Sequence, residues 1–163
     1  MDKDLQERIA KIRLLVMDSD GVLTDGGVYM DEEGREFRRF DIKDGLGLKR
    51  VMEAGIAVAI ISASSIESVR HRAEKLGISE VHIGIQDKLF VLQEICQRLG
   101  ITLDQVAYIG DDLADLAILR EVSLACAPAD AVEEVKAVAK LVTSRPGGHG
   151  AVREVCDVIV NNN

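Results

Sequence analysis

Aromatic residues are scarce in this chain of 163 residues: they make up 3% of it, and there is no tryptophan. A core built with so few of them must be aliphatic, which suits packed layers of helices and sheet and argues against aromatic platforms for single-stranded nucleic acid. Basic residues are outnumbered by acidic ones, and a formal net charge of −8 disfavours binding to a phosphate backbone. We therefore expect no nucleic-acid partner.

Long apolar runs are also missing, and none is long enough to cross a bilayer. The charged start, Met1-Asp-Lys-Asp4, is followed by no hydrophobic signal segment, so we expect no membrane association. Cysteine is rare: Cys96, Cys126 and Cys156 lie far apart and form no CxxC motif. We interpret them as free, buried thiols of a cytoplasmic protein.

What the chain does contain is 47% hydrophobic and 29% charged residues, a balance typical of one globular domain, here residues 1–163. Strand-like apolar runs alternate with segments of helical period. The expected strands are 14–17, 58–61, 81–83, 106–109 and, more weakly, 124–125. The expected helices are about 45–54, 66–76, 89–99, 113–120, 131–139 and 151–160. This alternation predicts an α/β fold with a doubly wound parallel sheet.

Residue types at the segment ends support these boundaries. Ser64 and Glu67 have the spacing of a capping box, and Asp87 can cap the helix that follows it. Gly77 and Gly100 come directly after predicted helices, where glycine commonly ends them.

One segment, about residues 26–41, breaks the alternation and predicts a β-hairpin around Asp31-Glu-Glu-Gly34. It follows the first strand and should project beside the end of that strand. A two-stranded ribbon is marginal alone, and this one is unusually apolar through Val28, Tyr29, Met30, Phe37 and Phe40. We therefore expect the hairpin to pair with copies of itself in a homo-oligomer.

Directly after the first strand come two carboxylates in Asp18-Ser-Asp20-Gly-Val-Leu-Thr24. Such a pair can hold a divalent cation and divide nucleophilic and acid/base roles. Asp and Gly are also common in turns and caps, which is the purely structural alternative. Other polar residues at strand ends or helix starts decide between the two: Ser62, Lys88 and Gly110-Asp-Asp-Leu-Ala-Asp115.

In a parallel sheet these positions share one edge, and the set suits phosphoryl transfer. Asp18 would be the nucleophile and Asp20 the acid and base. Asp111, with Asp112 or Asp115, would complete a Mg²⁺ site, while Ser62 and Lys88 would bind the phosphoryl group. Taken singly, Ser62 could be a turn residue, Lys88 a solvated one and the acidic run a helix cap.

The motifs of Asp18–Thr24, Ser62, Lys88 and Gly110–Asp115 resemble those of the haloacid dehalogenase superfamily of phosphatases. From Ile12 to Val160 the chain is also similar to the capless, tetrameric family of 3-deoxy-D-manno-octulosonate 8-phosphate phosphatases. The hairpin, Phe40-Asp-Ile-Lys-Asp-Gly-Leu-Gly47 and Gly147-Gly-His-Gly-Ala-Val-Arg-Glu-Val-Cys-Asp157 carry this second resemblance.

The resemblance implies a Rossmann-like fold without a cap domain, a homotetramer joined by hairpins, and Mg²⁺-dependent hydrolysis of that sugar-acid phosphate in lipopolysaccharide biosynthesis. It implies metal ligands at Asp18, Asp20 and Asp111, with Asp112 beside them. The implied substrate contacts are Asp20, Asp41, Ile42, Lys43, Asp44, Gly45, Lys49, Ser64, Arg72 and Lys88.

The second motif departs from the family, because Ser62-Ala63-Ser64 stands where those enzymes read Thr-Gly-Arg. The hydroxyl is kept and a bidentate anion binder is lost. A phosphatase of nine-carbon keto-deoxy sugar 9-phosphates and a non-catalytic regulatory domain on the same scaffold therefore stay open as alternatives. A signalling receiver domain is disfavoured, since receivers place the acidic pair first and the lysine last.

Overall fold

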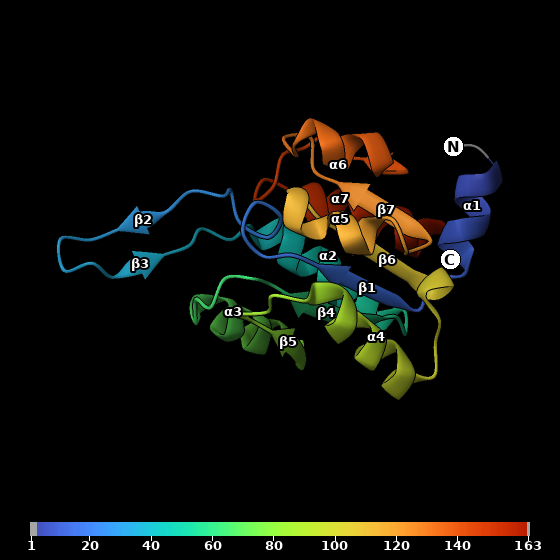
Figure 1. Cartoon of the computed structure of the whole chain (residues 1–163), viewed down its shortest axis with the longest axis horizontal. Helices are drawn as coiled ribbons and strands as arrows, with labels where there is room; N and C mark the ends of the chain where they lie inside the picture. The colour runs from blue at the N-terminus through green and yellow to red at the C-terminus, as the bar shows by residue number, and fades with distance from the viewer. Residues whose placement is uncertain (1–2, 163) are drawn as a thin grey trace.

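The computed structural model describes residues 3–162, which form a six-stranded parallel sheet between two layers of helices (Figure 1). The strand order is β5-β4-β1-β6-β7-β8. The strands are β1 (Leu14–Met17), β4 (Ala57–Ile61), β5 (Glu80–His82), β6 (Val106–Ile109), β7 (Leu124–Ala127) and β8 (Leu141–Val142). The helices are α1 (Lys3–Ala10), α2 (Ile42–Glu53), α3 (Ser68–Leu76), α4 (Lys88–Leu99), α5 (Leu116–Leu119), α6 (Glu133–Val138) and α7 (Ala151–Asn162), with short 3-10 turns η1 (Leu103–Gln105) and η2 (Leu113–Asp115).

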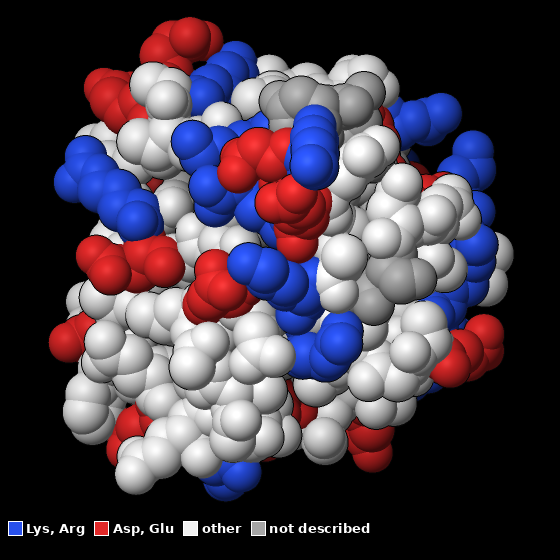
Figure 2. All heavy atoms as spheres, turned by 90° about the vertical axis from the view of Figure 1, so that its right-hand side faces the viewer, with Lys and Arg blue, Asp and Glu red and all other residues white. Residues whose placement is uncertain are grey.

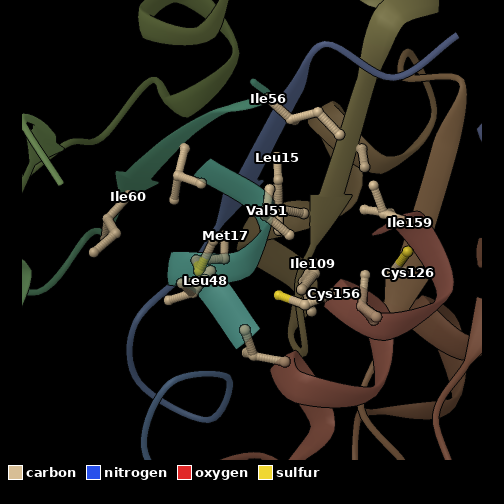
Figure 3. Packing of buried hydrophobic residues seen from close by; sticks show 14 of the residues in the cluster. Leu15, Met17, Leu48, Val51, Ile56, Ile60, Ile109, Cys126, Cys156 and Ile159 are labelled. Atoms are coloured by element: carbon tan, nitrogen blue, oxygen red, sulfur yellow. The ribbon is translucent and has the colours of Figure 1, made fainter. Parts of the chain in front are cut away.

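The central strand, β1, is buried on both faces because all four of its residues are apolar. Its side chains alternate between the two layers, as the pleat of a strand requires. Leu15 and Met17 belong to the core beneath α1, α2, α3 and α7, and Leu14 and Val16 to the core beneath α4, α5 and α6. Figure 3 shows the first of these cores, which joins Leu15 and Met17 of β1 to Leu48 and Val51 of α2 and also contains Cys156 and Ile159 of α7.

The predicted doubly wound parallel sheet is confirmed, and β1 and β6 begin and end at the predicted residues. The sequence reading missed α1 and β8. Helix α1 is mostly polar and buries only Ile9, and β8 is only two residues long.

Helix ends were predicted with mixed success. Asp87 caps α4 by accepting from the N–H of Phe90, and Gly77 and Gly100 end their helices in the left-handed conformation, as predicted. The prediction of a capping box at Ser64 and Glu67 is wrong, because α3 begins at Ser68 and the Glu67 side chain does not cap it.

The predicted hairpin is present as β2 (Tyr29–Met30) and β3 (Glu36–Phe37), an antiparallel pair that projects from the body of the molecule (Figure 1). Within residues 3–162 no cap domain is inserted: only this hairpin and α2 lie between β1 and β4. Both arms meet again at the body, where Thr24 pairs with Phe40. The hairpin therefore starts and ends beside the loop that follows β1.

The end of the molecule opposite the hairpin carries acidic and basic side chains side by side rather than in one continuous patch (Figure 2). Helix α1 lies at this end in Figure 1. Ion pairs between residues one turn apart form along it, including Arg8 with Asp4 at 2.7 Å. Among residues 3–162, we find no helix with the length and apolar character that a bilayer crossing requires.

Candidate active site

The loop after β1 is a compact turn that holds Asp18 in place. The N–H of Asp18 donates to Ile109 of β6 at 3.0 Å, so the sheet extends to this residue. Ser19 donates its N–H to Asp18 Oδ1 at 2.7 Å, and its carbonyl accepts from the N–H groups of Val22, Leu23 and Thr24. These bonds fix both the backbone and the carboxylate of Asp18.

Asp18 opens into a cleft of about 510 Å³ at the carboxyl edge of the sheet. The predicted residues that line it are Asp18, Asp20, Ser62, Ser64, Lys88, Asp111 and Asp112. Four strands or their connections supply them, as expected for a parallel sheet whose strand ends share an edge. The structure thus brings together side chains that lie up to 94 positions apart, from Asp18 to Asp112.

Lys88 lies at the bottom of this cleft and is only 4% exposed. Its ammonium group is 3.0 Å from Asp18 Oδ2 and 2.8 Å from Asp115 Oδ1. Burial alone would lower the pKa of Lys88, but the two carboxylates raise it. The lysine is therefore a fixed positive charge, and its start position on α4 is set by the Asp87 cap.

Asp115 is fully buried and is held by the protein through both of its oxygens. Oδ1 accepts from Lys88 and from the hydroxyl of Tyr108 at 2.6 Å, and Oδ2 accepts from the N–H groups of Asp111 and Asp112. It supports the cleft from below and does not line it. Sequence reasoning named Asp115 as an alternative to Asp112 but gave no sign of this supporting role.

The residues present fit a divalent cation. Carboxylate oxygens of Asp18, Asp111 and Asp115 all lie within 4.8 Å of one another. Burial and the neighbouring carboxylates, Asp18 first, raise the pKa of Asp111 to about 8, which reflects uncompensated negative charge. A Cβ on Gly21 would lie 2.0 Å from Asp111 Oδ2, so this carboxylate needs a glycine opposite it.

Asp112, predicted as a ligand, has a different partner. Its Oδ1 accepts from the N–H of Leu113 at 2.7 Å and caps η2, although the residue lines the cleft. The structure therefore groups Asp115, and not Asp112, with Asp18 and Asp111.

The hydroxyl residues of the second motif face the same cleft. Ser62 is buried, and its Oγ accepts from the N–H of Ser64 at 3.3 Å. Ser64 in turn accepts, through Oγ, from the N–H of Ile66. The position where the family carries arginine is thus occupied here by a short side chain at the wall of the cleft.

The other implied substrate contacts lie outside the cleft of their own chain. Asp41 caps α2, and its carbonyl accepts from Arg72 at 3.2 Å. Gly45 lies beside the Arg72 guanidinium, and Asp44 is buried against α7. Ile42, Lys43 and Lys49 are exposed. None of these residues is among those that line the cleft within residues 3–162.

Two features of the site were missed by the sequence reading. Arg38 donates from Nε to Asp20 Oδ1 at 3.0 Å. Gly147 and Gly148 pack on the backbone of the Asp18 loop, where a Cβ on Gly147 would lie 1.8 Å from the carbonyl oxygen of Gly21. The paired glycines were a visible signal of such close approach, whereas the Arg38 contact depends on how the hairpin folds back.

Comparisons with known proteins agree with this geometry. A family model described as haloacid dehalogenase-like hydrolase matches residues 80–154. The 3-deoxy-D-manno-octulosonate 8-phosphate phosphatase of Yersinia pestis is 43% identical over 157 residues, which are 96% of this chain and 84% of the relative.

Solved structures give the same result. The 3-deoxy-D-manno-octulosonate 8-phosphate phosphatase of Moraxella catarrhalis, in complex with magnesium, phosphate and KDO, has a TM-score of 0.97 at 40% identity and matches 100% of this chain and 94% of that one. The cobalt-bound deoxy-D-mannose-octulosonate 8-phosphate phosphatase of Haemophilus influenzae has a TM-score of 0.91 at 37% identity, over 95% and 91% of the two chains. This chain belongs to the family of 3-deoxy-D-manno-octulosonate 8-phosphate phosphatases, within the haloacid dehalogenase-like hydrolases.

Proposed function

We propose that the protein is a Mg²⁺-dependent phosphatase of 3-deoxy-D-manno-octulosonate 8-phosphate that works through an aspartyl-phosphate. The observation that carries the proposal is the placement of Asp18, whose carboxylate lies in the cleft between the Lys88 ammonium and Asp111. Relatives that share about two fifths of the sequence bear the name of this enzyme.

In the first step an Asp18 oxygen attacks phosphorus, and the bond from phosphorus to the sugar oxygen breaks. Asp20 gives that oxygen its proton, so the sugar leaves as an alcohol. In the second step Asp20 takes a proton from water, the water oxygen attacks phosphorus, and phosphate leaves a regenerated Asp18. Lys88 and Ser62 face the phosphoryl oxygens and stabilise their charge.

Asp18 and Asp111, which both face the cleft, would hold the metal together with the backbone carbonyl of Asp20. When bound, Mg²⁺ supplies positive charge for the phosphoryl oxygens and offsets the repulsion between the carboxylates. Asp115 keeps its protein partners and orients Lys88.

We also propose that the protein is a cytoplasmic homotetramer in which hairpins associate. Val28, Tyr29, Met30 and Phe37 are all exposed on the hairpin of a single chain, and apolar clusters of this kind are typical of interaction surfaces. The exposed members of the implied substrate set, Ile42, Lys43 and Lys49, do not line their own cleft, which is understandable if a second copy uses them. The three cysteines are buried and unpaired, in keeping with a reducing compartment.

Phosphate release from a panel of eight- and nine-carbon sugar-acid phosphates and an aryl phosphate, with and without Mg²⁺, tests the proposal. We expect the eight-carbon substrate to have the highest kcat/KM, and activity to be lost with a chelator. Asp18→Asn should be inactive, while Asp20→Asn should still bind phosphate.

Three results would contradict parts of this assignment. Wild-type turnover by Asp18→Asn would exclude the aspartyl-phosphate. A higher kcat/KM for the nine-carbon substrate would reassign the specificity. This comparison matters because Ser64 stands at the cleft wall in place of the arginine of the family. No Mg²⁺-dependent release from any ester would favour the regulatory alternative.

A further inference from the structure

The guanidinium of Arg38 is buried where a surface arginine would be expected. Arg38 follows β3 at the base of the hairpin, between two exposed residues, Phe37 and Arg39. Its own side chain is only 6% exposed. A buried guanidinium is destabilising unless its charge and its hydrogen bonds are matched, so its partners reveal what the burial serves.

Each of the three guanidinium nitrogens has a partner. Nε donates to Asp20 Oδ1 at 3.0 Å, Nη2 lies 3.1 Å from Glu36 Oε2, and Nη1 donates to the carbonyl of Phe37 at 3.2 Å. Arg38 does not line the cleft. An arginine engaged in this way is suited to hold a neighbour in position rather than to bind substrate.

The neighbour is Asp20, the proposed acid and base. Within residues 3–162, Arg38 is the one side chain that donates a hydrogen bond to this carboxylate. The bond occupies Oδ1, and Asp20 itself lines the cleft. Proton transfer to a leaving oxygen depends strongly on where the carboxyl group is held.

A second hydrogen bond links the same arm of the hairpin, through Gly148, to the loop that follows β1. Arg39 donates from Nη1 to the carbonyl of Gly148 at 2.6 Å, and the N–H of Gly148 donates to Val22 at 3.0 Å. Arg38 therefore links the base of the hairpin to this loop directly, and Arg39 links it indirectly through Gly148. The position of Asp20 therefore depends on how the hairpin is seated.

We propose that Arg38 is a positioning residue for the reaction, which orients Asp20 toward the leaving oxygen through the ion pair between hairpin and loop. This inference rests on the proposed phosphatase function. It assigns a role to the hairpin within one chain, apart from any role in assembly.

The test compares kcat/KM for two esters, since kcat/KM reports the steps up to departure of the leaving group. The sugar-acid phosphate has an alkyl leaving group that needs a proton, whereas p-nitrophenyl phosphate does not. For Arg38→Gln we expect the ratio of alkyl to aryl kcat/KM to fall about tenfold or more. Arg38→Lys, which keeps the charge without the fork, should lie between Arg38→Gln and the wild type.

Arg35→Gln is the matched control, because Arg35 lies on the same hairpin but pairs with Asp31 and Glu33 at its tip. Its ratio should equal that of the wild type. An unchanged ratio in Arg38→Gln, or an equal fall for both esters, would overturn the role of Arg38. Should Arg38→Gln fail to fold, a wild-type ratio in Arg38→Lys would overturn it instead. A wild-type enzyme inactive on both esters would refute the phosphatase function itself.

Discussion

Asp44 joins α2 to α7 through a single buried carboxylate. Its Oδ1 accepts from the N–H of Arg153 at 2.7 Å, so a side chain of one helix caps the start of another. Its Oδ2 is buried and has no hydrogen-bond partner among residues 3–162. Burial, with a smaller contribution from Asp41, raises the pKa of Asp44 from an ordinary 3.8 to about 6.

The sign of the pH effect follows from that direction. The folded state holds the Asp44 proton more tightly than the unfolded state does, so its contribution to stability is complete below pH 3.8 and is lost as the pH rises to about 6. Asp44→Asn keeps an acceptor and removes the titration. We expect its unfolding free energy to exceed that of the wild type increasingly across this window, by at most about 3 kcal/mol.

Denaturant unfolding at a series of pH values measures this difference. Asp104→Asn is the control, since Asp104 is an exposed acid paired with Lys11 at 3.5 Å. A difference between Asp44→Asn and the wild type that stays constant from pH 3.8 to 6 would contradict the prediction. Asp44→Ala, which loses the cap as well, should be destabilised at every pH.

At the same scale, the sequence predicted which side chains gather at the cleft and missed some of their hydrogen-bond partners. Asp18, Ser62, Lys88 and Asp111 each follow a strand or start a helix, so topology alone brings them to one edge. The Arg38 bond to Asp20 joins residues on either side of a hairpin, and no local pattern encodes it.

Among the elements, the loop before α7 packs closely against the loop that follows β1. A Cβ on Gly147 would lie 1.8 Å from the carbonyl oxygen of Gly21 and 2.5 Å from its carbon. Both are backbone atoms, so the loop that carries Asp18 and Asp20 would have to shift. The Asp130 side chain also accepts from the N–H of Gly147 at 2.9 Å, which restrains the other partner.

We therefore expect Gly147→Ala to lower kcat by about a hundredfold, since a shift near 1 Å in catalytic groups has an effect of that order. Gly100→Ala separates this effect from general destabilisation. Gly100 has a φ of +67° but open space around its Cβ position, so its replacement should reduce thermal stability and leave kcat unchanged. Equal kcat values in the two variants would show that the close approach does not matter for turnover.

Strong apolar runs made β1 and β6 predictable to the residue, while weak ones concealed α1 and β8. The start of α2 was also not predicted to the residue. The helix predicted at about 45–54 begins earlier, at Ile42, because Asp41 caps it there. A Cβ at Gly45 would lie 2.5 Å from Arg72 Nη2, and a Cβ at Gly47 would lie 3.0 Å from Cys156 Cβ, so close tertiary packing favours glycine against helix propensity.

At the scale of the whole molecule, the hairpin is the element that exposes a group of large apolar side chains. Val28 and Met30 are 62% and 58% exposed, and each strand of the ribbon has only two residues. Such a ribbon is marginal without further packing. Its base is nonetheless hydrogen-bonded to Asp20 and Gly148, so the proposed assembly surface and the proposed acid and base are connected through one element.

Two charges added to the hairpin should therefore change both the oligomeric state and the activity. We expect Val28→Asp combined with Met30→Asp to reduce the molar mass in solution from that of a tetramer toward that of one chain, and to lower kcat/KM as substrate contacts from the neighbour are lost. Light scattering coupled to gel filtration gives the mass. Val142→Asp is the matched control, because Val142 is 43% exposed and lies on β8, the edge strand of the sheet. This substitution should change neither the mass nor kcat/KM. A wild-type protein that runs as a fully active monomer would show that the exposed apolar side chains serve something other than self-association.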